Sequence, residues 1–203
     1  MSFYAWSARM AIRDQQFIYH LTSVQNVPSI LRQGLQPRAA LAQQGFRDIA
    51  DADIIEGRRN QALENFVPFH WFAKNPFDGR VHRDRPQENF VLIAMYRDYA
   101  SENNWRVIPR HPLAGGDFEL LDYQTGLARI DWDMMELRDY HDPACKHTCM
   151  AECLSPGPVL ASSFAKIYTP SAEIHGYVRQ HAVQQPGLGR LWIDTNPNMF
   201  PNR

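Results

Sequence analysis

The sequence predicts an α+β fold, and three observations support this class. Short aromatic and β-branched runs are interspersed with irregular helical segments along the 203-residue chain, which differs from the strict alternation of a doubly wound parallel sheet. No G-x-G-x-x-G and no G-x-x-x-x-G-K-[ST] motif occurs, so the phosphate cradles of Rossmann and P-loop folds are missing. A hydrophobic content of 44% supports one sizeable core, and we expect a single domain over residues 1–203.

The first third of the chain predicts one strand and two helical regions. Residues 17–22, FIYHLT, form a short aromatic and β-branched run that is typical of a buried strand. Ser23 is placed to cap the helix that follows, and Gly34 to end it in the left-handed conformation. Residues 47–65 are polar with scattered apolar positions, which predicts a helical excursion over the core.

The rest of the chain alternates strands with helices. Residues 67–73 and 90–97 predict two further strands, the second of them central, and Pro109 to Gly116 predict a loop. The remaining predicted elements are a short helix at 130–140, a strand at 151–157 that runs into a Pro/Gly turn, a strand at 164–170, a helix at 171–185 with Ser171 as its cap, and a short strand at 189–194.

Composition places the protein in a reducing, aqueous compartment. No stretch approaches the roughly 18 apolar residues of a membrane span, and the N-terminal residues lack the basic and apolar regions of a signal peptide. Three clustered cysteines, Cys145, Cys149 and Cys153, fit free thiols better than a disulfide framework. We therefore expect a cytoplasmic protein without membrane contact.

The formal net charge is −1, from 21 basic and 22 acidic residues, so the total charge does not by itself indicate a nucleic-acid partner. A local basic surface could still bind one, although a solvated charged face explains most such clusters. The candidates are Arg58, Arg59, Arg80, His82, Arg83 and Arg85.

Three sequence blocks carry a resemblance to a known family. Residues 18–38, IYHLTSVQNVPSILRQGLQPR, match the pattern IYHxTxxxNxxSILxxGLxxR throughout. Residues 67–80, VPFHWFAKNPFDGR, are similar to a VPFYF-x-P-R-x-P-M block, and residues 146–159, KHTCMAECLSPGPV, to a K-x-x-x-x-AEFLV block. In this order and spacing the blocks resemble those of the DarT-type DNA ADP-ribosyltransferases, the toxins of toxin–antitoxin pairs.

The resemblance implies an ADP-ribosyltransferase fold, in which two facing and largely antiparallel sheets with peripheral helices clasp NAD. It implies NAD as co-substrate, no metal, and transfer of ADP-ribose to a base of single-stranded DNA, with thymidine expected first and guanosine second. It also implies an antitoxin partner with a macrodomain-type hydrolase, and a monomer is expected. Two alternatives stay open: the same fold modifying RNA or protein, and a catalytically silent module that binds nucleic acid.

Glu152 is the predicted catalytic carboxylate. Cleavage of NAD at the nicotinamide ribose develops positive charge at the anomeric carbon, which a facing carboxylate stabilises more in the transition state than in the ground state. The alternative is a surface Glu on an edge strand. The resemblance also implies a catalytic arginine near residue 58, where Arg58 is favoured over Arg59 to hold the pyrophosphate or assist proton loss from the base.

The resemblance implies that the first two blocks hold NAD. His20 would bond a ribose hydroxyl, and the alternative is a hydrogen-bonded core histidine. Phe69, His70 and Trp71 stand where the family has aromatics, with His70 in place of the usual Tyr. One of the three, with Phe69 and Trp71 favoured, would stack on nicotinamide, and the others would pack in the core. The pocket wall would be completed by Thr22, Asn26, Gly34 and Leu35.

The segment before Glu152 is the expected acceptor loop. Lys146 matches a basic family position and His147 follows it, so Lys146 would contact phosphate beside an unpaired base. The spacing of the three cysteines lacks the second ligand pair of a zinc site. If residues 151–154 form a strand, Cys153 points away from Glu152 and packs as a small apolar side chain.

Overall fold

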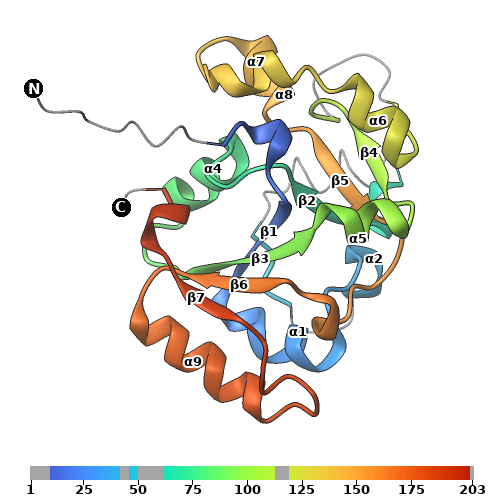
Figure 1. Cartoon of the computed structure of the whole chain (residues 1–203). Helices are drawn as coiled ribbons and strands as arrows, with labels where there is room; N and C mark the ends of the chain where they lie inside the picture. The colour runs from blue at the N-terminus through green and yellow to red at the C-terminus, as the bar shows by residue number, and fades with distance from the viewer. Residues whose placement is uncertain (1–9, 42–45, 50–61, 113–118, 202–203) are drawn as a thin grey trace, which may run out of the picture.

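The computed structural model describes residues 10–41, 46–49, 62–112 and 119–201 (Figure 1). Its strands form one seven-stranded sheet of order β4-β5-β2-β1-β3-β6-β7, in which every neighbouring pair is antiparallel except β6 and β7. The strands are β1 (Phe17–Ser23), β2 (Val67–His70), β3 (Phe90–Tyr96), β4 (Arg106–Ile108), β5 (Glu152–Ser155), β6 (Lys166–Thr169) and β7 (Ile193–Thr195).

Helices cover both faces of this sheet (Figure 1). One face packs against α1, α9 and the helices α5 to α8, whereas α4 and the C-terminal residues Met199 and Phe200 cover part of the other. The α-helices are α1 (Val27–Gln33), α2 (Arg38–Leu41), α4 (Pro76–Asp84), α5 (Arg97–Glu102), α6 (Tyr123–Arg129), α7 (Trp132–Leu137), α8 (Pro143–Thr148) and α9 (Ala172–Val183). The 3₁₀ turns are η1 (Ile12–Asp14), η2 (Val24–Asn26), η3 (Leu63–Asn65), η4 (Ala161–Ser163) and η5 (Pro197–Met199).

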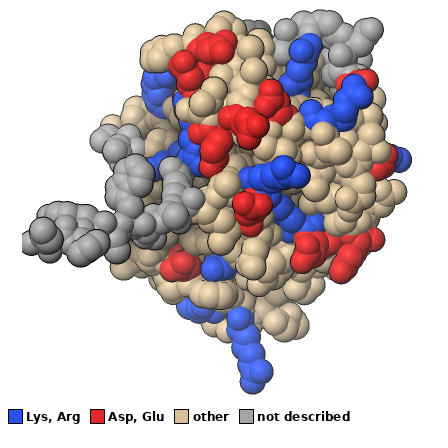
Figure 2. Space-filling model, turned by 45° about the horizontal axis from the view of Figure 1, so that its top comes forward, with Lys and Arg blue, Asp and Glu red and all other residues tan. Residues whose placement is uncertain are grey.

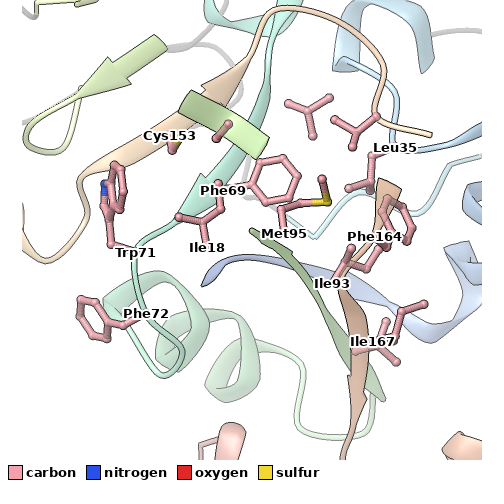
Figure 3. Packing of buried hydrophobic residues seen from close by; sticks show 14 of the residues in the cluster. Ile18, Leu35, Phe69, Trp71, Phe72, Ile93, Met95, Cys153, Phe164 and Ile167 are labelled. Carbon is pink, nitrogen blue, oxygen red and sulfur yellow. The ribbon is translucent and has the colours of Figure 1, made fainter. Parts of the chain in front are cut away.

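The larger apolar core lies under the first of these faces. Figure 3 shows Phe69 of β2 beside Ile18 of β1 and Met95 of β3, and all three side chains are fully buried. Because side chains alternate across a strand, the residues next to these three in each strand lie on the opposite face of the sheet. In β2 and β5 this alternation places Phe69 and Cys153 in the core and their neighbours His70 and Glu152 on the opposite face.

The sheet is narrowest where β1 meets β2. A single register pair, Tyr19 with His70, joins these strands, whereas seven pairs join β1 to β3. Pro68 contributes to this narrow seam, because proline has no N–H to donate to a neighbouring strand. The expected pair of facing sheets is therefore not confirmed: β4-β5-β2 and β1-β3-β6-β7 are two halves of one sheet, held together at this seam.

A buried arginine fastens the seam on one side. The guanidinium of Arg97 donates to the carbonyl oxygens of Ile12 at 2.8 Å, Arg13 at 2.7 Å, Trp71 at 3.0 Å and Phe17 at 3.3 Å. Its Cζ also lies 5.0 Å from the centroid of the Trp71 indole. Since Phe17 is in β1 and Trp71 directly follows β2, the side chain bridges the two strands where their backbone pairing has ended.

Every strand and all three helices that were predicted outside residues 42–61 have a counterpart in the structure, with shifted ends. The strand expected at 67–73 stops at His70, and the helix expected at 130–140 covers only Trp132–Leu137. Most of the helical excursion at 47–65 and the end of the loop at Pro109 to Gly116 lie outside the described residues. Helices α4, α6 and α8 were not predicted, although each begins after an Asx residue whose side chain accepts backbone N–H groups: Asn75, Asp122 and Asp142.

We expect Arg97→Lys to lower the free energy of unfolding by about 2–4 kcal/mol. An ammonium keeps the charge but cannot reach four carbonyl groups held in different directions, so buried acceptors lose their donor. Urea denaturation followed by circular dichroism measures the effect. Arg83→Lys is the matched control, because its side chain is 75% exposed, and equal unfolding midpoints for both variants would contradict the role of Arg97.

Candidate active site

A cleft opens beside the seam between β1 and β2. Its walls come from β1, the end of α1 and the turn after it, the segment 46–49, η3, β2, the first turn of α4 and the start of β5. Five of the predicted site residues line it: His20, Thr22, Gly34, Leu35 and Glu152. These residues are up to 132 positions apart in the sequence, so only the order of strands in the sheet brings them together.

Glu152 is the first residue of β5 and is 6% exposed. It stands opposite His70 of β2 on one side and Ile108 of β4 on the other. The next residue, Cys153, is fully buried in the main core, so the alternation of β5 directs Glu152 to the cleft, as the sequence predicted. Glu152 is therefore on a central strand of the sheet and not on an exposed edge.

His20 lies in the same cleft and is neutral at physiological pH. Burial lowers the pKa of its imidazole to about 4, with smaller contributions from the nearby His70 and Arg38. Nδ1 lies 2.8 Å from the carbonyl oxygen of Pro68. A carbonyl can only accept, so the single proton of the neutral ring sits on Nδ1 and leaves Nε2 as an acceptor. This arrangement suits a hydroxyl donor in the cleft.

The aromatic residues of the second block lie in different places from those the sequence suggested. Phe69 and Trp71 are 0% and 1% exposed and belong to the main core, which corrects their predicted contact with the cofactor. The cleft instead presents His70, whose ring stacks on Phe77 of α4 with centroids 5.4 Å apart and planes inclined at 28°. The period of two along β2 explains the exchange, because it places Phe69 on the core face and the side chain of His70 on the opposite face.

Asn26 has a positioning role and does not line the cleft. Its amide oxygen accepts the N–H of Arg47 at 3.0 Å, and its amide nitrogen donates to the Arg47 carbonyl at 3.0 Å and to Thr22 Oγ1 at 3.2 Å. The segment next to Arg47 supplies Phe46, Asp48 and Ile49 to the cleft wall. Asn26 therefore holds this wall against β1.

Gly34 closes the cleft at the end of α1. Its φ of 79° lies in the left-handed region, and an added Cβ would stand 2.5 Å from the carbonyl oxygen of Val159. Leu35 and Val159 exchange backbone hydrogen bonds of 2.8 and 2.9 Å directly beside this contact. The close approach joins the turn after α1 to the segment that follows β5.

Two histidines mark the opposite rim of the cleft. His111 lines the cleft together with Met150, and its ring stacks on that of His147 with centroids 6.2 Å apart and planes inclined at 24°. The His111 N–H also donates to the His147 carbonyl at 2.8 Å. Lys146 is exposed on α8 and does not line the cleft. Sequence reasoning missed His111, because it follows a short strand, β4, that was not predicted.

A hydrogen bond joins this rim to the loop after β2. The Tyr140 hydroxyl donates to the Lys74 carbonyl at 3.1 Å, and the Lys74 N–H donates to the Asp78 carboxylate at 2.8 Å. Asp78 is buried, which raises its pKa to about 7. Lys74 has a φ of 62°, so these contacts hold a left-handed turn that leads directly into Phe77.

The candidate arginines in α4 and directly after it are paired with acidic neighbours. Arg80 and Arg83 lie 3.5 and 3.8 Å from the Asp84 carboxylate, and Arg85 lies 3.7 Å from Glu88. Figure 2 shows basic and acidic side chains interspersed over one face of the molecule, without a continuous basic patch there. These pairs match the expectation of a solvated charged face.

Arg58 and Arg59 lie outside the described residues. In the part of the chain that is described, no group of three or more His, Cys, Asp or Glu side chains is arranged to hold a metal ion. The described helices are all too short or too polar to cross a membrane.

Comparison with known families assigns the chain. Residues 19–200 match the family of the ssDNA thymidine ADP-ribosyltransferase DarT. The chain belongs to this family. The resemblance seen in the three sequence blocks is thus confirmed, and with it the enzyme class: the family transfers ADP-ribose to single-stranded DNA, and thymidine is the base that it modifies.

Solved structures of DarT proteins share the fold. Thermus sp. 2.9 DarT in complex with ADP-ribosylated ssDNA has a TM-score of 0.79 at 20% identity, covering 92% of this chain and 96% of that one. The same protein in complex with NAD+ has a TM-score of 0.76 at 17% identity, with coverages of 93% and 98%. Thermosipho africanus DarTG in complex with ADP-ribose has a TM-score of 0.74 at 19% identity and covers 93% of this chain and 52% of that one. No curated protein sequence matches the chain.

We expect the ring of His20 to titrate with a midpoint near pH 4 and to carry its proton on Nδ1 above that pH. Since the pKa in the folded state lies below the usual 6.5, the unfolded chain takes up this proton first. His20 therefore lowers stability as the pH falls from about 6.5 to about 4.

Ring ¹⁵N chemical shifts in a His-labelled sample would show both the midpoint and the tautomer, with His20→Asn identifying the signals. The partly exposed His175 is an internal reference in the same spectrum. A His20 midpoint close to 6.5, or a proton on Nε2, would contradict the arrangement.

Proposed function

We propose that this chain transfers ADP-ribose from NAD to thymidine of single-stranded DNA in the cleft between β1, β2 and β5, with Glu152 as the catalytic carboxylate. One observation carries the assignment of the site: the buried Glu152 shares the cleft with His20 and His70, within a chain that matches the DarT family over residues 19–200. A single domain over the whole chain is part of the proposal.

Glu152 acts on the bond that breaks. The bond between C1′ of the nicotinamide ribose and the nicotinamide nitrogen separates with its electron pair on nicotinamide, which leaves as a neutral molecule. C1′ then carries oxocarbenium-like positive charge, and a carboxylate fixed on a sheet strand faces that charge without having to reorganise. Its low exposure strengthens the interaction, because little water screens it.

The cleft walls fit NAD as a ligand. Nε2 of His20 accepts a hydrogen bond from a ribose hydroxyl. Because the ring is neutral, it does not repel the positive charge that develops at C1′. The stacked pair of His70 and Phe77 offers an aromatic surface for nicotinamide beside Glu152. Thr22, Gly34 and Leu35 complete the wall, where the missing side chain of Gly34 lets the backbone approach closely.

The rim formed by His111, His147 and Met150 faces the acceptor. Thymine has one ring N–H, at N3, so the new bond from N3 to C1′ requires loss of that proton. In a duplex this N–H is paired with adenine, which explains why the substrate is single-stranded. The histidine pair offers planar rings for the unpaired base, and Lys146 on the outer side of α8 can contact a phosphate.

Arg58 is proposed to assist catalysis, either by holding the pyrophosphate of NAD or by easing proton loss from the base. The proposed cellular setting is the cytoplasm, where a modification of DNA bases would be toxic. A macrodomain-type hydrolase that removes the modification is the proposed antitoxin partner, and the chain is proposed to act as a monomer.

We expect Glu152→Gln to lower the rate of transfer at least about 100-fold, since the amide removes the negative charge but keeps the size of the side chain. The measurement is incubation of purified protein with labelled NAD and a thymidine-containing single strand, beside matched strands that lack thymidine and RNA and protein acceptors. NAD binding by calorimetry should change little.

Cys153→Ser is the matched control on the other face of β5, and we expect it to retain transfer if its melting temperature allows folding. Label in RNA or protein would overturn the acceptor but not the carboxylate. Transfer by Glu152→Gln at the wild-type rate would overturn the role of Glu152, and no transfer by the wild type despite NAD binding would favour a silent binding module.

Arg58→Ala and Arg59→Ala separate the two neighbouring arginines. We expect Arg58→Ala to lower transfer at least about tenfold, because it removes the guanidinium proposed to assist the reaction, and Arg59→Ala to stay within about twofold of the wild type. A raised KM for NAD with unchanged kcat indicates a role at the pyrophosphate, whereas a lowered kcat indicates a role in proton loss. The reverse order of the two variants would assign the function to Arg59.

A further inference from the structure

A lysine is enclosed by aromatic rings on the sheet face that also carries Glu152. Lys166 begins β6 and is 8% exposed. Its Nζ lies 3.6 Å from the centroid of the Trp192 ring and 5.3 Å from those of Phe17 and Tyr168. Trp192 reaches this position because β6 and β7 run parallel in register, with the Ile167 N–H donating to the Trp192 carbonyl at 2.9 Å.

The N–H groups of the Lys166 ammonium are available to donate hydrogen bonds. Across the described part of the chain it makes no hydrogen bond and no ion pair, although more than nine-tenths of the residue is buried. Ring faces attract a cation but do not accept its N–H groups as an oxygen does. The Nζ atom is not itself fully enclosed, so an anionic group that approaches from the open side of the rings can reach it.

The open side is itself aromatic. Trp192 is 58% exposed and Tyr96 45% exposed, among the largest apolar side chains that the described surface presents to solvent. The ring of Tyr96 packs on that of Phe17 with centroids 5.0 Å apart, and Trp192 packs on Lys166 itself. Exposed rings beside a cation are the features with which proteins hold single-stranded nucleic acid.

The register of the sheet relates this corner to the active site. Glu152 stands opposite His70, His70 opposite Tyr19, Tyr19 opposite Ala94, and Ala94 opposite Lys166. Directly opposed residues of neighbouring strands share a face, so Lys166 and Glu152 lie on the same face, about 19 Å apart along the sheet at a strand spacing of about 4.8 Å. At about 3.4 Å per stacked nucleotide, roughly six nucleotides of one strand cover that distance.

We propose that Lys166 and Trp192, with Tyr96 at their side, form a secondary binding site for the DNA strand that flanks the modified thymidine: Lys166 binds a phosphate and the exposed indole of Trp192 stacks on a base. The site rests on the proposed function, because it takes the acceptor strand of that reaction. It adds affinity for longer strands and plays no part in the chemical step at Glu152.

The test compares strand lengths. Wild type, Trp192→Ala and Lys166→Met are measured by fluorescence anisotropy and by transfer from labelled NAD, on a thymidine trimer and on a strand with about eight nucleotides on each side of the thymidine. We expect Trp192→Ala to weaken binding of the long strand about five- to tenfold and to leave transfer to the trimer unchanged. Lys166→Met keeps the packing in the aromatic enclosure, and should reduce the slope of log Kd against log salt by about 0.7 for the long strand.

Tyr177→Ala is the matched control, because Tyr177 is a 36% exposed aromatic residue on α9, which packs on the other face of the sheet. The site would be overturned if both test variants bound the long strand with wild-type affinity, or if they lost affinity equally for both strand lengths. It would also be overturned if the wild type formed a dimer without DNA and Trp192→Ala were a monomer, because Trp192 would then lie in a dimer interface. If Trp192→Ala has a much lower melting temperature than the wild type, the slope of log Kd against log salt for Lys166→Met tests the site instead. Absence of transfer by the wild type on every strand would instead overturn the proposed function.

Discussion

The narrow seam between β1 and β2 is the constraint on which the rest of the structure depends. One backbone pair, Tyr19 with His70, carries the sheet across it. Side chains replace the missing ladder on both sides: Arg97 donates to the carbonyls of Phe17 and Trp71, and His20 bonds the carbonyl of Pro68. Buried carbonyl groups need donors, so these two residues complete the hydrogen bonding that the backbone leaves open.

The same seam places the cleft. In a fully paired sheet, regular rows of side chains would fill this region. Here β1 and β2 diverge, and the turn after α1 lies beside them in the wall of the cleft. His20 therefore has two roles, because the bond that stabilises the seam through Nδ1 also leaves Nε2 as an acceptor in the cleft. One neutral imidazole thus links the stability of the seam to the proposed binding of NAD.

Contacts with DNA depend on individual cationic side chains and not on the net charge of the protein. With a net charge of −1, it cannot attract DNA by a broad positive field, and the arginines of α4 are neutralised by neighbouring carboxylates. The cations without a carboxylate partner in the described structure, such as Lys146 and Lys166, carry more weight for that reason. Lys166 lies beside the ring of Trp192, which is an arrangement suited to a strand that offers alternating phosphates and bases.

The sequence by itself determined the family, the α+β class, most strands and the choice of Glu152 as the proposed catalytic carboxylate. These features depend on local patterns: the IYHxT block and the AEC segment can be recognised without neighbours, and the alternation of β5 separates Glu152 from Cys153. Only the tertiary structure decided that Phe69 and Trp71 are core residues while His70 and Phe77 face the cleft, and that His111 joins His147 at its rim. Strand order and register set those choices, and pairing between strands far apart in the chain leaves no periodic signal within either strand.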